Sequence, residues 1–220
     1  MDSSNKVVVI TQRIDDIEGR NERRDSLDQM LSEWVCSSGL TPMPIPNVFF
    51  KKENIDLNLK NEPLEAWLKI ANPRALLLSG GNDIGEYEER DRTESYLLAW
   101  AKSLQLPVLG ICRGMQMMAT WTGGSLKRVD GHVKARHKII RSNEKDVFPE
   151  TVNSFHEWGL ASCPDEYVVK AMSEDGVIEA IKHIELPWEG WMWHPEREDI
   201  FSDQDTNRLK NLFARDTQSD

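Results

Sequence analysis

The sequence has few cysteines, no long apolar run and no excess of positive charge, and each shortage excludes a class of protein. Its three cysteines, Cys36, Cys112 and Cys163, form no C-x-x-C pair, so neither a disulfide framework nor a zinc–thiolate site is expected. The apolar run from Val7 to Ile10 is too short for a signal-peptide core or a membrane span. We therefore expect a cytoplasmic protein whose free thiols stay reduced.

A surplus of acidic residues marks the composition. The 220 residues carry a formal net charge of −10. This charge argues against a nucleic-acid or anionic membrane partner, because either would repel the chain as a whole. A local basic patch remains compatible with a phosphorylated small molecule. With 39% hydrophobic and 29% charged residues, residues 1–220 are expected to form a single globular domain.

Apolar runs alternate with amphipathic segments through much of the chain. Unbroken apolar runs are typical of buried parallel strands, and apolar residues at spacings of three and four indicate helices. Strands are expected at 7–11, 41–45, 75–78 and 107–111, and helices at 27–35, 63–71, 91–104, 113–121 and 206–214. This alternation predicts an α/β fold, a mostly parallel sheet with helices on both faces. Short runs at 167–171 and 177–181 predict antiparallel additions to it.

Cys112 lies in a G-x-C-x-G motif, from Gly110 to Gly114, between a predicted strand and a predicted helix. This is the cysteine counterpart of the nucleophile elbow, a sharp turn that raises the side chain above the carboxyl edge of a sheet. The thiol also lies at a helix N-terminus, where the helix dipole favours the reactive thiolate. The motif indicates a nucleophile, whereas an isolated cysteine at a strand end is more commonly a core residue.

His194 and Glu196 follow a tryptophan-rich strand predicted at 188–193. Two residues apart on an extended chain, their side chains point to the same side, so the carboxylate can orient the imidazole. Such a pair supplies the base that a thiol hydrolase needs. Taken alone, the His-Pro-Glu motif is also compatible with a surface histidine in a turn.

Together these motifs resemble the class I glutamine amidotransferase superfamily. The order and spacing of the matching segments cover residues 74–198. The segments are Ser79-Gly80-Gly81-Asn82-Asp83, Gly110 to Gln116, Gly123-Gly124-Ser125-Leu126, Val152-Asn153-Ser154-Phe155-His156 and Trp193 to Glu196. The resemblance implies a flavodoxin-like fold and cleavage of a γ-glutamyl amide, with Cys112 as nucleophile, His194 as base and Glu196 as its partner.

The resemblance also implies roles for groups around this triad. The backbone amides of Gly81 and Arg113 would form the oxyanion hole. The groups that hold the glutamyl amino and carboxylate groups would be Gln116, Asn153, Ser154 and Phe155. Gln116 has a second interpretation, as a polar residue on the exposed side of its helix.

Two positions depart from the family pattern. Ser79 stands where the family often has proline, and Met192 where it often has glutamine. Neither supplies a catalytic side chain, so the departures concern the substrate pocket and leave the chemistry unchanged.

Two classes of enzyme within the superfamily are the alternatives for this chain. An amidotransferase passes ammonia from glutamine to a synthetase, which here would have to be a partner chain. A stand-alone hydrolase releases both products. Arg90-Asp91 with Glu94, Asp175-Gly176 with Glu179-Ala180, and the pair His132 and His137 resemble the stand-alone γ-glutamyl hydrolases.

Arginine-containing segments narrow the resemblance further. Thr11 to Arg13, Glu22 to Asp25 and His194 to Arg197 resemble hydrolases of bacterial capsule and other surface-polysaccharide pathways, which implies a nucleotide-linked γ-glutamyl substrate. Arg13 follows the first strand, and Arg23 is expected to begin the next helix, so both are candidates to bind a diphosphate. Solvated surface charges remain the alternative interpretation.

His132 and His137 form the one histidine pair that invites a metal interpretation. They are five residues apart with no third ligand nearby in the sequence, which is a weak pattern for zinc. We expect them to structure a loop beside the site, and we expect neither a metal nor an organic cofactor.

Overall fold

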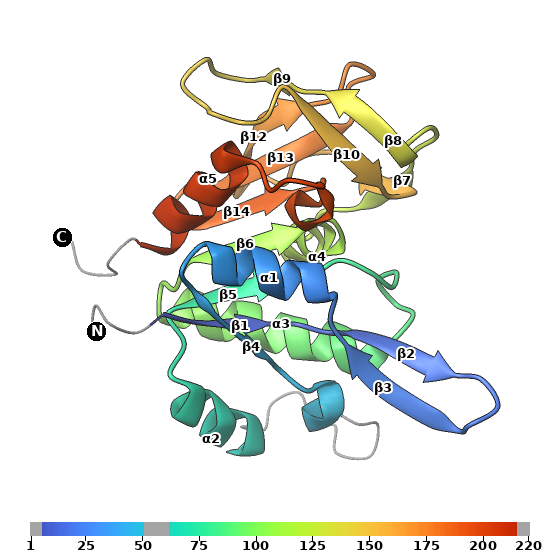
Figure 1. Ribbon diagram of the computed structural model, residues 1–220, viewed down its shortest axis with the longest axis vertical. Helices are drawn as coiled ribbons and strands as arrows, with labels where there is room; N and C mark the ends of the chain where they lie inside the picture. Colours follow the sequence, from blue (N-terminus) through green and yellow to red (C-terminus); the bar gives the residue numbers. More distant parts are fainter. Residues whose placement is uncertain (1–5, 51–61, 215–220) are drawn as a thin grey trace.

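An eight-stranded sheet forms the centre of the molecule (Figure 1). The computed structural model describes residues 6–50 and 62–214. The strand order is β4-β1-β5-β6-β14-β13-β12-β9. The strands are β4 (Thr41–Pro44), β1 (Val7–Ile10), β5 (Ala75–Leu78), β6 (Val108–Ile111), β14 (Trp188–Trp191), β13 (Ile178–His183), β12 (Tyr167–Met172) and β9 (Ile140–Arg141).

The five strands from β4 to β14 are parallel, and β13, β12 and β9 add antiparallel pairs. This arrangement confirms the predicted α/β class and the antiparallel additions. Because β1, β5, β6 and β14 run in one direction, their carboxyl ends meet at one edge of the sheet. That edge is where doubly wound sheets bind ligands.

Helices cover both faces of the sheet, because side chains alternate along each buried strand. Val8 and Ile10 pack with α1 and α5, whereas Val9 packs on the opposite face with α2, α3 and α4. Figure 1 shows these layers. The helices are α1 (Gln29–Ser37), α2 (Glu62–Ala71), α3 (Glu88–Ser103), α4 (Arg113–Trp121) and α5 (Asp203–Phe213).

Local signals account for the helix boundaries. Asp28 accepts a hydrogen bond from the Met30 amide at 2.9 Å and caps the start of α1. Gly39 follows the end of α1 with a φ of +76°, a conformation that glycine adopts without strain. Ser202 caps α5 by accepting from the Asp205 amide at 3.3 Å.

Three two-stranded ribbons project from this core. The polar segment after β1, including Arg23, forms a hairpin, so the expectation that Arg23 begins a helix was wrong. Most of its β3 side chains are exposed charges, so no apolar stripe exists to bury a helix. The ribbons pair β2 (Arg13–Ile17) with β3 (Glu22–Ser26), β8 (Val133–Lys138) with β10 (Thr151–Phe155), and β7 (Leu126–Arg128) with β11 (Trp158–Leu160). Within residues 6–50 and 62–214, no helix has both the length and the apolar character needed to cross a bilayer.

Candidate active site

Cys112 occupies a strained turn between β6 and α4. Its φ is +51° and its ψ is −107°, a conformation that a non-glycine residue adopts only when the surroundings impose it. A Cβ at Gly110 would collide with the Met118 sulfur, and one at Gly114 would collide with the Leu78 carbonyl. Glycine on both sides is therefore a packing requirement of the elbow, and the thiol lies at the N-terminus of α4.

His194 and Glu196 lie at the end of the neighbouring strand β14, in and before a short 3₁₀ turn (Pro195–Arg197). The imidazole Nδ1 is 2.6 Å from the Glu196 Oε1, and both side chains are buried. Because Nδ1 is engaged with the carboxylate, the ring interacts with Cys112 from its other side. The interpretation of this motif as a surface turn is therefore wrong.

Asn153 on β10 fixes the backbone of His194 from both sides. Its Oδ1 accepts from the His194 amide at 2.9 Å, and its Nδ2 donates to the His194 carbonyl at 2.7 Å and to Glu198 at 2.8 Å. This side chain is thus committed to holding the His194 backbone. Its expected part in binding the glutamyl group stays a prediction.

The electrostatics of the site favour a charged imidazole. Burial lowers the pKa of His194, but the negative charges of Glu196 and Cys112 outweigh it and raise the pKa to about 9. A protonated His194 beside the sulfur carries the proton that a leaving amine needs. The pair can therefore both attack a carbonyl and protonate a leaving amine.

Gly80 and Gly81 follow β5, and they lie close to His194 and Arg13, respectively. A Cβ at Gly80 would lie 2.7 Å from the His194 Cε1, so only glycine allows the imidazole to lie this close. Gly81 has a φ of +81°, and Arg13 packs against it. The resemblance locates half of an oxyanion hole at the Gly81 amide, and the preceding residue, Gly80, lies beside His194.

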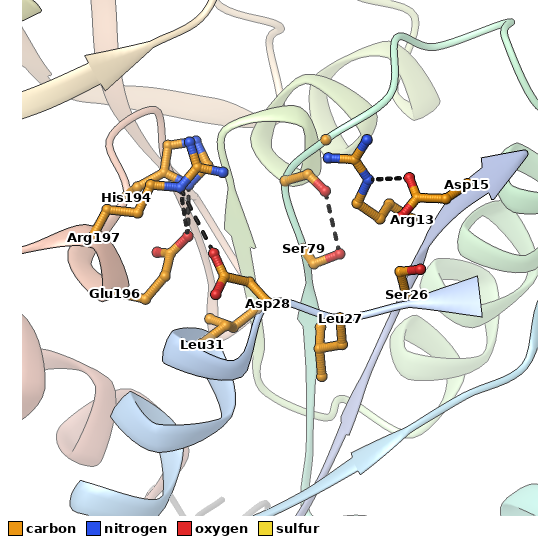
Figure 2. Close-up of a pocket in the computed structure, with 12 residues that line it drawn as sticks. Arg13, Asp15, Ser26, Leu27, Asp28, Leu31, Ser79, His194, Glu196 and Arg197 are labelled. Carbon is orange, nitrogen blue, oxygen red and sulfur yellow. Dashed lines mark hydrogen bonds and ion pairs between the residues drawn. The ribbon is translucent and has the colours of Figure 1, made fainter. Parts of the chain in front are cut away.

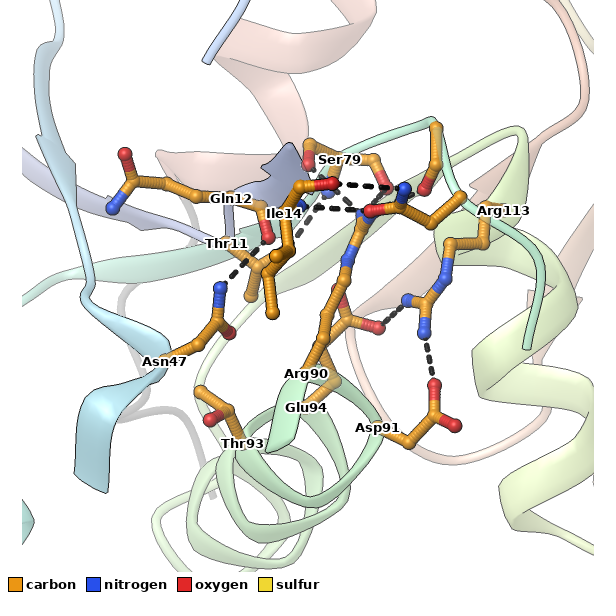
Figure 3. Close-up of polar contacts among 12 residues, drawn as sticks. Thr11, Gln12, Ile14, Asn47, Ser79, Arg90, Asp91, Thr93, Glu94 and Arg113 are labelled. Carbon is orange, nitrogen blue, oxygen red and sulfur yellow. Dashed lines mark hydrogen bonds and ion pairs between the residues drawn. The ribbon is translucent and has the colours of Figure 1, made fainter. Parts of the chain in front are cut away.

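Arg90 of α3 holds this glycine loop from beneath (Figure 3). Its guanidinium donates to the carbonyls of Ser79 at 2.9 Å, of Gly80 at 3.0 Å and of Gly81. Arg90 is fully buried, and its Nε pairs with Glu94 at 3.1 Å. Burial lowers the pKa of Arg90 to about 10, so the side chain stays charged at neutral pH.

Arg113 at the start of α4 completes the buried charge network shown in Figure 3. Its side chain pairs with Glu94 and Asp91 of α3. Burial opposes ionisation of Glu94, but Arg113 and Arg90 together lower its pKa. The Arg113 side chain is thus committed to these carboxylates, and the oxyanion role implied by the resemblance concerns its backbone amide alone.

Gln116, one turn into α4, is buried, so its interpretation as an exposed polar residue is wrong. Its Nε2 donates to the Trp158 carbonyl at 2.8 Å and lies 3.8 Å from the Met192 sulfur. Ser154 is buried and donates to the His132 carbonyl. Phe155 packs edge-on against His194, with ring centroids 5.9 Å apart. Of these three residues only Phe155 contacts His194 directly, and contact of Gln116, Ser154 and Phe155 with a substrate stays a prediction.

A cavity of about 270 Å³ is lined in part by His194 and Glu196 (Figure 2). Its charged lining consists of the guanidinium groups of Arg13 and Arg197 and the carboxylates of Asp15, Asp28 and Glu196, the last of these paired with His194. Arg13 pairs with Asp15 at 2.8 Å yet remains about half exposed. The remaining lining residues are Ser26, Leu27, Leu31, Ser79, Gly80 and Gly81.

Arg23 is not among the residues that line this cavity. It lies on β3, where it pairs with Asp16 at 2.8 Å and Glu89 at 2.5 Å and stacks over Tyr87. Its neighbours fasten the hairpin to α3. Of the two arginines expected to bind a phosphate, the structure brings only Arg13 beside the base.

Two structural roles in this site were not predicted from the sequence. Arg197 lies in the His-Pro-Glu-Arg segment but was not assigned to the pocket that it lines. Asn153 was assigned to substrate, whereas its amide holds the His194 backbone. Neither role has a local signal, because each depends on a contact between segments far apart in the chain.

Comparison with known proteins agrees with this geometry. The family model described as Peptidase C26 matches residues 22–196. The chain is 34% identical over 131 residues to the γ-glutamyl-CDP-amidate hydrolase of Campylobacter jejuni, covering 57% of this chain and 63% of that protein. It is 33% identical over 128 residues to the glutamine-hydrolyzing GMP synthase subunit of Methanococcus aeolicus, covering 56% of this chain and 64% of that one. Both alignments span less than two thirds of the relative's length.

A solved structure shows the same fold. The crystal structure of a putative GMP synthase subunit from Thermoplasma acidophilum superposes with a TM-score of 0.67 at 18% identity, covering 95% of this chain and 93% of that one. This similarity confirms the fold expected from the motif resemblance.

The raised pKa of His194 generates a prediction about pH dependence. If the imidazolium is required, kcat/KM falls as pH rises through about 9, because His194 then loses its proton. Glu196→Gln removes the attraction that raises this pKa, so the alkaline limb moves to lower pH. Steady-state rates between pH 6 and 10 measure both profiles, and Glu33→Gln, an exposed change on α1, serves as control. An alkaline limb that Glu196→Gln leaves in place contradicts the assignment.

The buried network generates a prediction about stability. Arg90→Leu leaves Glu94 buried with one partner fewer and three loop carbonyls without their donor, so the free energy of unfolding falls by about 3–5 kcal/mol. Urea denaturation followed by tryptophan fluorescence measures the change. Arg24→Leu removes a half-exposed arginine of the hairpin and is expected to change little. Equal effects of the two substitutions would show that burial of the Arg90 charge is not what matters.

Proposed function

The chain belongs to the Peptidase C26 family, and we propose that it is a cysteine-dependent hydrolase of γ-glutamyl amide bonds. The observation that carries the proposal is the convergence of Cys112, His194 and Glu196 at one edge of the sheet. A strained elbow presents the thiol, and the adjacent strand presents a base with its orienting carboxylate at 2.6 Å. These are the parts that nucleophilic acyl transfer requires.

The proposed first half-reaction forms a thioester. The Cys112 thiolate attacks the γ-carbonyl carbon, and the carbonyl oxygen becomes an oxyanion held by the backbone amides of Gly81 and Arg113. The carbon–nitrogen bond breaks as the protonated His194 transfers its proton to the departing nitrogen. Glu196 keeps the ring oriented during this transfer.

The second half-reaction releases glutamate. His194, now neutral, accepts a proton from water, which attacks the thioester carbonyl through the same oxyanion hole. The carbon–sulfur bond breaks and returns the Cys112 thiolate beside a protonated His194. Gln116, Asn153, Ser154 and Phe155 are proposed to hold the glutamyl end, either directly or by fixing the groups around it.

We further propose γ-glutamyl-CDP-amidate as the substrate, cleaved to glutamate and cytidine diphosphoramidate for modification of a capsule polysaccharide. Two observations support this choice. One is the 34% identity to the Campylobacter jejuni enzyme of that name. The other is the cavity beside His194, where Arg13 and Arg197 offer guanidinium groups suited to a diphosphate.

A second candidate follows from the GMP synthase relatives. In this alternative the chain is a glutaminase subunit that delivers ammonia to a partner synthetase. The triad serves either function, and the difference lies in what occupies the leaving-group side. Glutamate release by the purified chain separates them when glutamine, a simple γ-glutamyl amine and γ-glutamyl-CDP-amidate are offered in parallel. Release mainly from glutamine, or only after a synthetase is added, favours the second candidate.

Loss of the nucleophile tests the chemistry common to both candidates. Cys112→Ala is expected to lower kcat by about 10³-fold or more, because no thioester can form. Mass spectrometry of the wild-type chain, quenched during turnover, should show a glutamyl adduct on Cys112 that the variant lacks. Near-normal turnover by Cys112→Ala would refute the triad.

The nucleotide proposal has its own test at Arg13. Arg13→Ala is expected to raise KM for γ-glutamyl-CDP-amidate about tenfold or more, because a charge-assisted contact with the diphosphate is lost. Arg23→Ala, on the same hairpin but outside the cavity lining, is the matched control and should raise KM less. If neither variant changes KM for the nucleotide substrate while both retain kcat, the diphosphate is not bound here.

A further inference from the structure

Three buried side chains come together where the β8–β10 ribbon meets strand β13 of the main sheet. His132 precedes β8, His156 follows β10, and Glu179 lies on β13. The His132 Nδ1 is 3.3 Å from the His156 Nε2, and these nitrogens lie 3.5 and 3.7 Å from the Glu179 Oε1. All three side chains are at least 96% buried. None of them belongs to the catalytic triad.

Each histidine has a second ring nitrogen, here called the outer nitrogen, that faces away from Glu179. The hydrogen-bond partners of these outer nitrogens determine where the ring hydrogens lie. The His132 Nε2 is 2.9 Å from the Asp175 carboxylate, and the His156 Nδ1 is 3.1 Å from the Trp158 carbonyl. A carboxylate and a carbonyl accept hydrogen bonds, so each outer nitrogen carries a hydrogen. In neutral rings the two inner nitrogens then present lone pairs to each other and to Glu179.

With both rings neutral, the carboxylate of Glu179 has no positively charged or hydrogen-bonding partner among the described residues, although it is fully buried. An extra proton on one ring would ease the contact between the two nitrogens. At 3.5 and 3.7 Å, however, it would not give Glu179 a hydrogen bond of normal length. A cation between the three atoms satisfies all of them.

We propose that His132, His156 and Glu179 bind a divalent cation of the zinc class. In tetrahedral coordination, metal–ligand distances of about 2.0–2.2 Å separate neighbouring ligand atoms by about 3.3–3.5 Å, close to the 3.3, 3.5 and 3.7 Å found here. Asp175 and the Trp158 carbonyl hold the rings as the outer partners of ligating histidines do. His137 packs against His132 with its ring tilted by 41°, and its buried Nε2 lacks a hydrogen-bond partner within the described residues.

The position of the cation site suggests a structural role beside the catalytic centre. Its ligands join the β8–β10 ribbon to β13 of the main sheet, two parts that belong to separate sheets (Figure 1). The Trp158 carbonyl that anchors His156 also accepts from Gln116. The Glu179 carbonyl accepts from the Met192 amide, two residues before His194. A bound cation would therefore hold Ser154 and Phe155 in place against the base.

Metal titration of the full chain tests the proposal without relying on activity. The chain is prepared as Cys112→Ser, so that the nucleophile cannot bind the metal, stripped with a chelator, and titrated with Zn²⁺ by calorimetry. One ion per chain is expected. Glu179→Gln in the same background should abolish binding, whereas Glu174→Gln, an exposed change of equal charge in the adjoining turn, should leave it unchanged.

Asp175→Asn guards against a variant that fails to fold, because Asp175 is more than half exposed. It should weaken Zn²⁺ binding about 10- to 100-fold, as loss of an outer partner does at known sites. Zn²⁺ should also raise the Tm of the stripped Cys112→Ser chain, and Mg²⁺ should not. Absence of Zn²⁺ binding, or binding that Glu179→Gln and Asp175→Asn leave unchanged, would overturn the proposal.

Discussion

The pairing of buried charges between α3 and α4 is the interaction on which the rest of the site depends. Arg90 and Arg113 approach Glu94 from two sides, and all three are out of contact with water. Charges are costly to bury unless each finds its partners, so this network tolerates few alternative arrangements. Arg90 also donates hydrogen bonds to the carbonyls of Ser79 and Gly80 after β5. The network therefore connects the loop after β5 with the start of α4, the helix that follows Cys112.

The fold and the proximity of Cys112, His194 and Glu196 could be predicted because their signals are local. Unbroken apolar runs identify buried strands, and Gly110 and Gly114 identify the elbow through the collisions that any side chain there would cause. The spacing of His194 and Glu196 places both on one side of a short segment. Each of these signals consists of residues within a few positions of one another, and such local patterns are readable from the sequence.

The features that escaped prediction depend on contacts between distant segments. In the hairpin that contains Arg13 and Arg23, β3 carries four consecutive exposed charges, so its sequence lacks the alternation of apolar and polar residues that predicts a strand. The burial of Glu179 among histidines is equally invisible, because the β13 sequence alone is that of an ordinary strand. His132 and His137 attracted attention as a pair, whereas the shorter nitrogen–nitrogen contact joins His132 to His156.

The strand order has a consequence for how the chain is made. β6 and β14 are neighbours in the sheet, with Val108 opposite Trp188, yet the whole antiparallel half of the molecule separates them in the sequence. While the chain emerges from the ribosome, β6 is therefore an apolar strand with one unpaired edge, although α3 and α4 can already cover one of its faces. Such edges invite pairing with other chains. Synthesis of Trp188–Trp191 supplies the partner of this edge, and His194, three residues further on, then comes beside Cys112.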